Sequence, residues 1–207
     1  MKEAVIMGID LSTSSTGVAI VQGEELLYDG VLSIKKPSEL HFFELTQEYE
    51  NFLKPLIQKY NPEFYFVEAP AKAMGGGSNN NTIMRLYTAN HLCCYWIEKE
   101  TGKRPIHFMP STIRAMNGVE IKRGIAKKEV KKTVLDKVID LEPSFSYELT
   151  RQGNPQPGTY DRADAVLVAR AGQKHVRTNY PKTNTRNPTE VGEGMVVQVP
   201  EVQTPQK

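Results

Sequence analysis

Acidic side chains stand at the ends of two strand-like segments and again, as a pair, near the C-terminal end of the sequence. Asp10 and Glu68 each end an apolar segment, where a solvated carboxylate is least expected. Asp161 and Asp164 are three residues apart. Carboxylates gathered in one place repel each other, and divalent cations with oxygen ligands would offset that charge. The pattern therefore points to metal-assisted hydrolysis of phosphodiesters.

Each of these residues also has an ordinary structural explanation. Asp10 fits the end of a strand that turns at Ser12. Asp161 and Asp164 fit the first turn of a helix, where the helix dipole favours acidic side chains. Asp164 is followed by small and apolar residues, so we expect it to face inward and rank it above Asp161 as a metal ligand. The metal-site interpretation depends on these acids meeting in the fold.

The composition is typical of a globular protein with one main domain. The chain has 207 residues, of which 39% are hydrophobic and 24% are charged, which is enough for a substantial core. Its apolar segments are shorter than the roughly 20 residues of a membrane helix, and no signal peptide is expected at the start. Cys93 and Cys94 are the only cysteines, so we expect no disulfide framework and a reducing, cytoplasmic setting.

The spacing of apolar residues predicts an α/β fold. Strands are expected at 4–10, 17–21, 26–33, 64–67 and 105–109. Helices are expected at 39–60, 82–100, 110–116, 126–141 and 161–174. Pro55 is expected to kink or break the first helix.

The order of these elements predicts a five-stranded mixed sheet flanked by helices. The first three strands are expected to form an antiparallel meander, and the last two, reached through helices, to lie parallel to their neighbours. If the strand before Glu68 lies beside the first strand, Glu68 and Asp10 come close, and the last helix lays its two acids over the same place. Residues 1–174 would form this domain. Residues 175–207, polar and rich in proline, are expected to be a disordered tail.

A basic segment follows the fifth predicted strand. Residues 121–138 hold seven Lys or Arg. Such a segment is usually a solvated helix face. Here Val130, Val134 and Val138 form an apolar stripe that would be buried, which leaves the lysines exposed to contact phosphates.

Several of these fragments, in this order, resemble the RuvC-type Holliday-junction resolvases of the ribonuclease H-like superfamily. The resemblance covers residues 3–174 and leaves out the tail. It rests on Gly8-Ile9-Asp10 with Gly17, Val67-Glu68, Ile113-Arg114, Ala126-Lys127 with Val130, and Asp161-x-x-Asp164-Ala165.

The resemblance implies a ribonuclease H-like fold and a homodimer that binds four-way DNA junctions and nicks two strands symmetrically, with no membrane partner. It implies two Mg²⁺ or Mn²⁺ ions per active site, held by Asp10, Glu68, Asp161 and Asp164. Lys127 would lie near the scissile phosphate as a catalytic cation, and the helix around 82–98 would form much of the dimer interface. With the basic segment, the expected DNA contacts are Arg114, Lys122, Arg123, Lys127, Lys128, Lys131 and Lys132.

The chain departs from the family at the loop 71–81. Bacterial relatives often carry an aromatic residue three positions after the glutamate, whereas this chain has Ala71, so base stacking at the junction centre is not implied. The glycines at 75–77 are not followed by the Lys-Ser/Thr of a phosphate-binding loop. These departures and the extra tail fit a bacteriophage or other viral relative, acting in the cytoplasm of a bacterium or host.

Three alternatives remain open at this stage. Residues 8–17 also resemble the first phosphate-binding turn of sugar-kinase and actin-like ATPases, although those proteins need a second, duplicated domain. The chain would otherwise be a non-catalytic protein that binds junctions, or a nuclease of the same fold that acts on other branched DNA or on RNA/DNA hybrids.

Overall fold

The computed structural model describes residues 3–70, 80–122 and 124–180. The predictions made for Ala71, the glycines at 75–77, Arg123 and most of the tail fall outside these residues. Among the described residues, no helix is long and apolar enough to cross a membrane.

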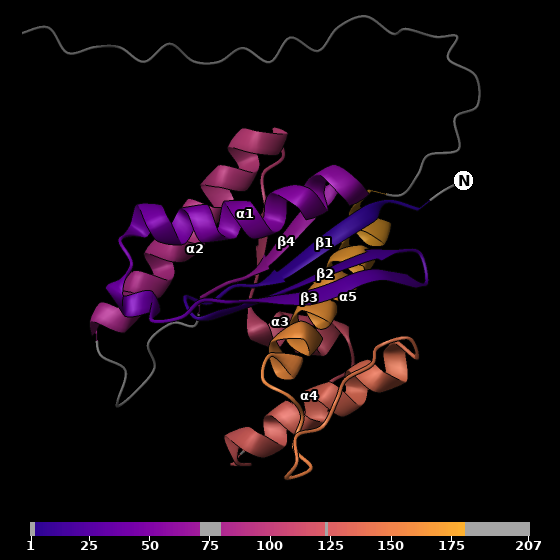
Figure 1. Ribbon diagram of the computed structural model, residues 1–207. Helices are drawn as coiled ribbons and strands as arrows, with labels where there is room; N and C mark the ends of the chain where they lie inside the picture. The colour runs from indigo at the N-terminus through magenta and orange to yellow at the C-terminus, as the bar shows by residue number, and fades with distance from the viewer. Residues whose placement is uncertain (1–2, 71–79, 123, 181–207) are drawn as a thin grey trace, which may run out of the picture.

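A five-stranded mixed sheet forms the centre of the molecule (Figure 1). The strand order is β3-β2-β1-β4-β5. β1 pairs antiparallel with β2 and parallel with β4, β2 pairs antiparallel with β3, and β4 pairs parallel with β5. The predicted meander and the two parallel pairings are confirmed. The strands are β1 (Val5–Asp10), β2 (Ser15–Gln22), β3 (Glu25–Ser33), β4 (Phe64–Glu68) and β5 (Ile106–Phe108).

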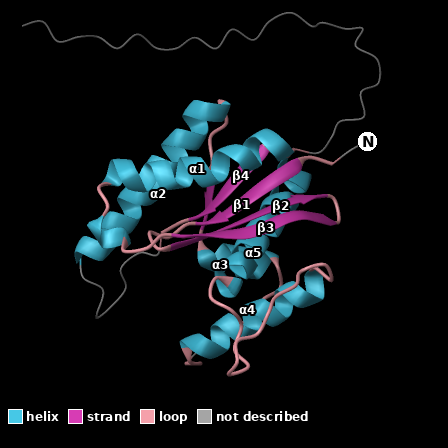
Figure 2. Cartoon of the chain, viewed as in Figure 1, coloured by secondary structure: helices cyan, strands magenta, loops and turns pink. Residues whose placement is uncertain are grey.

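Helices cover both faces of the sheet (Figure 2). α1 and α2 pack on one face, and α5 lies across the other with α3 and α4 beside it. The predicted fold class, a five-stranded mixed sheet flanked by helices, is confirmed. The helices are the 3-10 helix η1 (Pro37–Glu39), α1 (Phe42–Tyr60), α2 (Asn80–Thr101), α3 (Pro110–Met116), α4 (Lys127–Leu141) and α5 (Thr159–Asn179).

Alternation of side chains along the central strands produces two separate cores. Ile6 of β1 and Phe66 of β4 belong to the core beneath α3, α4 and α5. Met7, which follows Ile6 in β1, and Tyr65, which precedes Phe66 in β4, belong to the core beneath α1 and α2. Successive residues of a strand point to opposite faces, so the apolar strands are buried on both sides, as expected for strands in parallel pairing.

The first long helix differs from its prediction in two details. It begins after His41, whose backbone N–H is accepted by the Glu44 carboxylate at 2.7 Å and whose ring accepts the Phe43 N–H at 3.3 Å. It is also continuous through Pro55, so of the expected kink or break the break does not occur. Both Pro55 and Asn51 are exposed, and water can therefore satisfy the Asn51 carbonyl that proline leaves without a donor.

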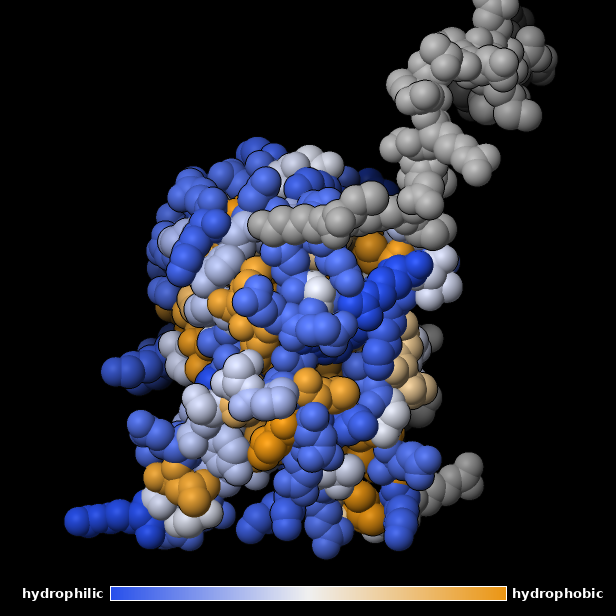
Figure 3. Space-filling view, turned by 90° about the vertical axis from the view of Figure 1, so that its right-hand side faces the viewer, coloured by the Kyte–Doolittle hydropathy of each residue, from blue (hydrophilic) through white to orange (hydrophobic). Residues whose placement is uncertain are grey.

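The last helix continues past the predicted boundary at residue 174. Val176 is buried, and the His175 ring packs against the rings of Phe66 and Phe108, at centroid distances of 5.8 Å and 5.4 Å. Residues 175–179 are thus helical, with His175 and Val176 packed on the core. Only the part of the predicted tail after Tyr180 is not described. On the face shown in Figure 3, hydrophilic residues predominate and hydrophobic residues form small separate patches.

Two glycines allow α5 to lie directly against the sheet. A Cβ atom added to Gly8 would overlap the backbone of Ala165 and Ala169, and one added to Gly17 would overlap the backbone of Asp161. No other residue type fits at such a backbone approach. The motif glycines at positions 8 and 17 therefore position α5, and Gly17 positions its first turn.

Candidate active site

The ends of β1 and β4 bring two of the predicted acids together. Ile9 pairs with Val67 in the parallel register, so the next residues, Asp10 and Glu68, lie side by side at the same edge of the sheet. Alternation places both side chains on the face that carries Ile6 and Phe66, which is the face covered by α5. Register and pleat thus direct two carboxylates toward the same helix.

The first turn of α5 supplies the other two acids. The helix begins after Gly158, which has a φ of 86°. Asp161 accepts a hydrogen bond from the Ser15 hydroxyl at 2.5 Å, which ties the helix to the start of β2. Asp164 is one turn further along, on the same side of the helix. Both acids retain some exposure to solvent.

The electrostatics show that the four carboxylates act on one another. Burial raises the pKa of Asp10 well above its ordinary value, and repulsion from the other three carboxylates raises it further. Burial and repulsion from Asp164 raise the pKa of Glu68 to about 7. Burial and repulsion from Asp161 raise the pKa of Asp164 to about 6. The predicted acid cluster therefore exists as an electrostatic unit.

Two cations offset part of this repulsion. Lys131 of α4 opposes the rise in pKa of both Asp10 and Asp164, and Arg114 of α3 opposes the rise at Glu68 and Asp164. The sequence predicted Arg114 and Lys131 as DNA contacts. Their positions beside the acids suit a second task, which is to hold a phosphate or a developing negative charge at the cluster.

The remaining predicted basic residues lie farther out. Lys122 is exposed before α4, and Lys127, Lys128 and Lys132 are exposed on that helix. Lys127, the predicted catalytic cation, is the first residue of α4, and its role stays a prediction. These four lysines are exposed on, or just before, the helix that carries Lys131.

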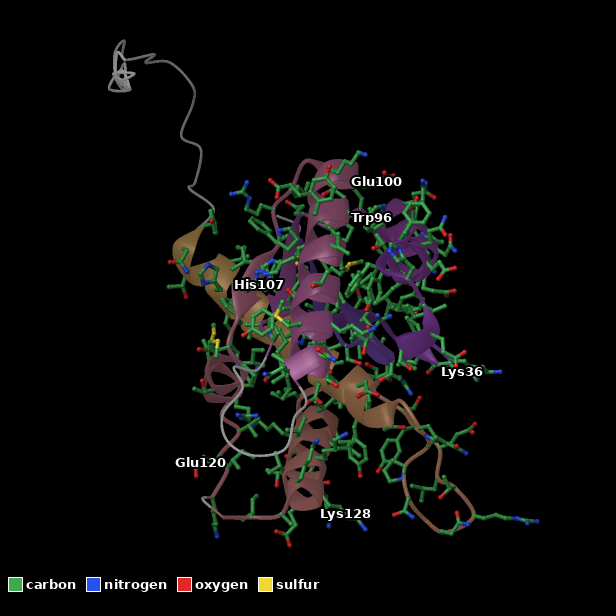
Figure 4. The ribbon with its side chains drawn as sticks, turned by 90° about the vertical axis from the view of Figure 1, so that its left-hand side faces the viewer. Lys36, Trp96, Glu100, His107, Glu120 and Lys128 are labelled. Carbon is green, nitrogen blue, oxygen red and sulfur yellow. The ribbon has the colours of Figure 1, made fainter. Side chains whose placement is uncertain are left out.

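A hydrogen-bonded support behind Glu68 was not predicted. Asn90 of α2 is fully buried, and its side-chain amide donates to the backbone carbonyl of Glu68 at 3.3 Å. The Asn90 carbonyl oxygen lies 2.7 Å from Nε2 of His107 on β5, which faces α2 (Figure 4). Asn90 gives no signal of this role in the sequence, because nothing in the periodicity of α2 distinguishes an amide that will meet a strand end.

The donor types at this site suit a hard divalent cation. Carboxylate oxygens are the ligands that Mg²⁺ and Mn²⁺ prefer. Burial, and after it repulsion from neighbouring carboxylates, raises the pKa of three of the acids, and a bound cation would oppose both effects. Among the described residues, no three His, Cys, Asp or Glu side chains are arranged to ligate one ion. Ligation would therefore require the carboxylates to draw closer, and a cation would provide the attraction for that movement.

Comparison with solved structures identifies the fold. RuvC of Thermus thermophilus bound to a Holliday junction substrate matches 84% of this chain and 96% of its own, with a TM-score of 0.61 and 16% identity. The yeast mitochondrial Holliday junction resolvase Ydc2 matches 84% of this chain and 81% of its own, with a TM-score of 0.54 and 16% identity. The fold is thus ribonuclease H-like, of the kind seen in RuvC. No family model and no curated protein matches the sequence.

We expect Asp10→Asn to stabilise the protein when divalent metal is absent. The pKa of Glu68 is about 7 in the folded protein against 4.5 ordinarily, and that of Asp164 about 6 against 3.8. At a pH between the ordinary and the folded-state pKa of each acid, the folded protein binds more protons than the unfolded chain. The free energy of unfolding is therefore highest below pH 4 and falls as the pH rises through 7. Removing one charge reduces that loss. At pH 8 in EDTA, Tm should rise by about 5 °C, or about 1–2 kcal/mol.

The gain should shrink as pH falls toward 4, because the acids are then protonated in both proteins. Thermal unfolding from pH 4 to pH 8 measures both quantities, with the exposed Asp140→Asn as the matched control on α4. Mg²⁺ should raise the Tm of the wild type more at pH 8 than at pH 5. An Asp10→Asn protein less stable than wild type at every pH would contradict the repulsive cluster.

Proposed function

We propose that this protein is a structure-selective DNA endonuclease that resolves four-way junctions by paired, symmetric nicks. The observation that carries the proposal is the meeting of Asp10, Glu68, Asp161 and Asp164 at one edge of a ribonuclease H-like sheet. Lys131 and Arg114 lie beside them. The likeness to structures described as Holliday junction resolvases supports the choice of substrate. The sequence departures favour a phage or viral origin.

The four acids would hold two Mg²⁺ or Mn²⁺ ions. Bound there, the ions would supply an activated water and stabilise the departing 3′-oxygen, which leaves 5′-phosphate and 3′-hydroxyl ends. The protein's own groups orient these parts. Ser15 holds Asp161 through its hydroxyl, Asn90 holds the backbone at Glu68, and Lys131 supplies positive charge for the phosphate.

The basic surface of α4 would guide the DNA backbone to this site. Lys127, Lys128 and Lys132 are exposed on α4, and Lys122 is exposed just before it. Arg123, in the same segment, is included from the sequence. Charges of this kind bind phosphates without reading sequence and make the affinity depend on salt. Selectivity for a junction must then come from shape and from the pairing of two sites.

Paired nicks require two active sites, so we propose a homodimer formed through α1 and α2. A groove between these helices is lined by Phe43, Leu92, Tyr95 and Trp96, with Trp96 on α2 (Figure 4). Phe43 is 67% exposed and Tyr95 is 65% exposed. Large exposed apolar side chains beside a groove are typical of an association surface. The α2 helix is also the segment for which the family resemblance implies this role.

The function is tested by cleavage of a synthetic immobile four-way junction and a matched linear duplex. Wild type is incubated with Mg²⁺, Mn²⁺ or EDTA, beside Asp10→Asn. We expect wild type to make symmetric nicks in the junction but not in the duplex, and only when Mg²⁺ or Mn²⁺ is present. Asp10→Asn should make no nicks but should still bind the junction, because less negative charge faces the phosphates. Retained cleavage by Asp10→Asn would contradict the metal site, and cleavage confined to flaps or hybrids would reassign the substrate.

Lys131→Ala and Lys127→Ala separate catalysis from binding. Both lie on α4, one turn apart, but Lys131 is the one of the two that lowers the pKa of Asp10 and Asp164. We expect both changes to lower the single-turnover cleavage rate more than the junction affinity. The loss should be the larger for Lys131→Ala, at roughly 100-fold. Equal losses of rate and affinity would make either lysine a phosphate contact only.

Tyr95→Glu tests the dimer. A charge placed in the apolar groove would be desolvated on association, so we expect a monomer by light scattering at concentrations where wild type is a dimer. The monomer should lose paired nicking of the junction. Gln58→Glu, at an exposed position of α1 outside the groove, is the matched control. An unchanged mass for Tyr95→Glu would place the interface elsewhere.

A further inference from the structure

A second cavity lies next to the acid cluster, between α4 and the segment that joins α4 to α5. Its volume is about 520 Å³, within the range of pockets that bind small organic groups. The walls come from two sides. Lys128, Lys132 and Leu135 contribute from α4, and Tyr147, Leu149 and Pro155 from the connecting segment. Figure 4 shows Lys128 near the start of α4, with the connecting segment alongside.

The connecting segment is a folded wall. Leu149 and Pro155 form an antiparallel bridge. Around it, the Thr150 N–H donates to the Asn154 carbonyl at 2.7 Å and the Gln156 N–H donates to the Glu148 carbonyl at 3.0 Å. This miniature hairpin is anchored by Phe145, which is buried in the core beneath α5. The pocket is therefore held in shape by backbone hydrogen bonds and by a core residue.

The chemistry of the lining favours a flat, neutral, polar-edged group. Tyr147 and Tyr160 contribute aromatic rings, and Leu149 is a large apolar residue that is 56% exposed. The amide of Asn154 provides both donors and acceptors.

The charges along the walls cancel. Lys128 and Lys132 are balanced by Glu129 and Asp136. A phosphate would gain little from such a lining, whereas a nucleobase could use its aromatic faces, its apolar floor and its hydrogen-bonding edges.

The pocket borders the candidate active site through Tyr160. The Tyr160 ring lines the pocket, and the next residue in the chain is Asp161 of the acid cluster. Nζ of Lys131 lies 5.2 Å from the centroid of the same ring, and Lys131 is the cation that acts on Asp10 and Asp164. A DNA strand with one phosphate at the acids would therefore bring a nearby base to the mouth of the pocket.

We propose that this pocket binds one unstacked nucleobase of the strand that is cleaved. The proposal rests on the proposed function and adds to it a base-reading subsite. Taking a base out of a stack costs least where pairing is already disturbed, as it is at the branch point of a junction. A base held beside the acids would fix the register of the scissile phosphate and make the cleavage rate depend on which base occupies the pocket.

The test pairs an abasic scan of the junction with Tyr147→Ala. The full chain carrying Asp10→Asn is used so that the DNA stays intact, and binding is followed by fluorescence anisotropy. Each nucleotide near the cleavage point is replaced in turn by an abasic site. We expect one position to weaken binding by about tenfold, the loss that follows from one base stacked on an aromatic ring.

Tyr147→Ala in the same background should reduce that position-specific loss several-fold, because the base then keeps only the ring of Tyr160. Asn154→Ala should reduce it. Tyr180→Ala removes a 53% exposed tyrosine at the far end of α5, and the loss should persist in that control. Thermal unfolding of each variant checks that it is folded.

The outcomes separate the two proposals. If wild type nicks junctions in the presence of metal but no abasic position weakens binding, the base pocket is overturned and the proposed nuclease function stands. A position-specific loss of unchanged size in Tyr147→Ala would also overturn it, because another surface would then hold the base. If the protein neither binds nor cleaves junctions, both proposals fall together.

Discussion

The close contact between α5 and the sheet is the constraint on which the candidate site depends. α5 packs against four of the five strands, and it approaches them most closely at Gly8 and Gly17. Gly17 is paired with Asp10 across the β1–β2 ladder, and the backbone of Asp161 lies against that glycine. Gly17, which allows α5 to approach the sheet, is thus directly opposite Asp10, the aspartate that lies beneath the first turn of α5. The acid cluster follows from this one approach, because β1 and β4 already present their terminal acids on the same face.

A buried ion pair sets α4 against α5 and so places the basic groups. The Arg170 guanidinium donates to the carboxylate of Glu142, the residue that follows α4, and to the carbonyl oxygens of Gly23 and Glu24 in the β2–β3 turn. Arg170 is 7% exposed and Glu142 is 2% exposed. Such a pair adds little net stability over an apolar contact, but the loss of one partner costs about 3–5 kcal/mol. Its contribution here is orientation: with this end of α4 fixed, the Lys131 face is held over the acids.

The sequence was sufficient for the features that depend on local pattern. Apolar runs that end in Asp10 and Glu68 defined the strands, and the pleat then required both side chains to share a face. Three features were not predictable in this way: the support from Asn90, the effect of the Lys131 charge on the acids, and the hairpin at Leu149 and Pro155. Each depends on the rotation of a helix about its axis or on the path of a loop. Tertiary packing sets both of these, and neither leaves a periodic signal in the sequence.

In the proposed function, the charge balance at the site would separate the docking of DNA from the chemistry. The four carboxylates outnumber the two cations beside them, and their mutual repulsion adds to burial in raising the pKa of Asp10, Glu68 and Asp164. A phosphate brought into this cluster would add a further negative charge. Phosphodiester binding at the acids is therefore favourable only with counter-charge from outside the chain. In the proposed function, the exposed lysines of α4 would attract DNA without such counter-charge. Affinity for DNA would then rest on α4, and cleavage on the acids of β1, β4 and α5.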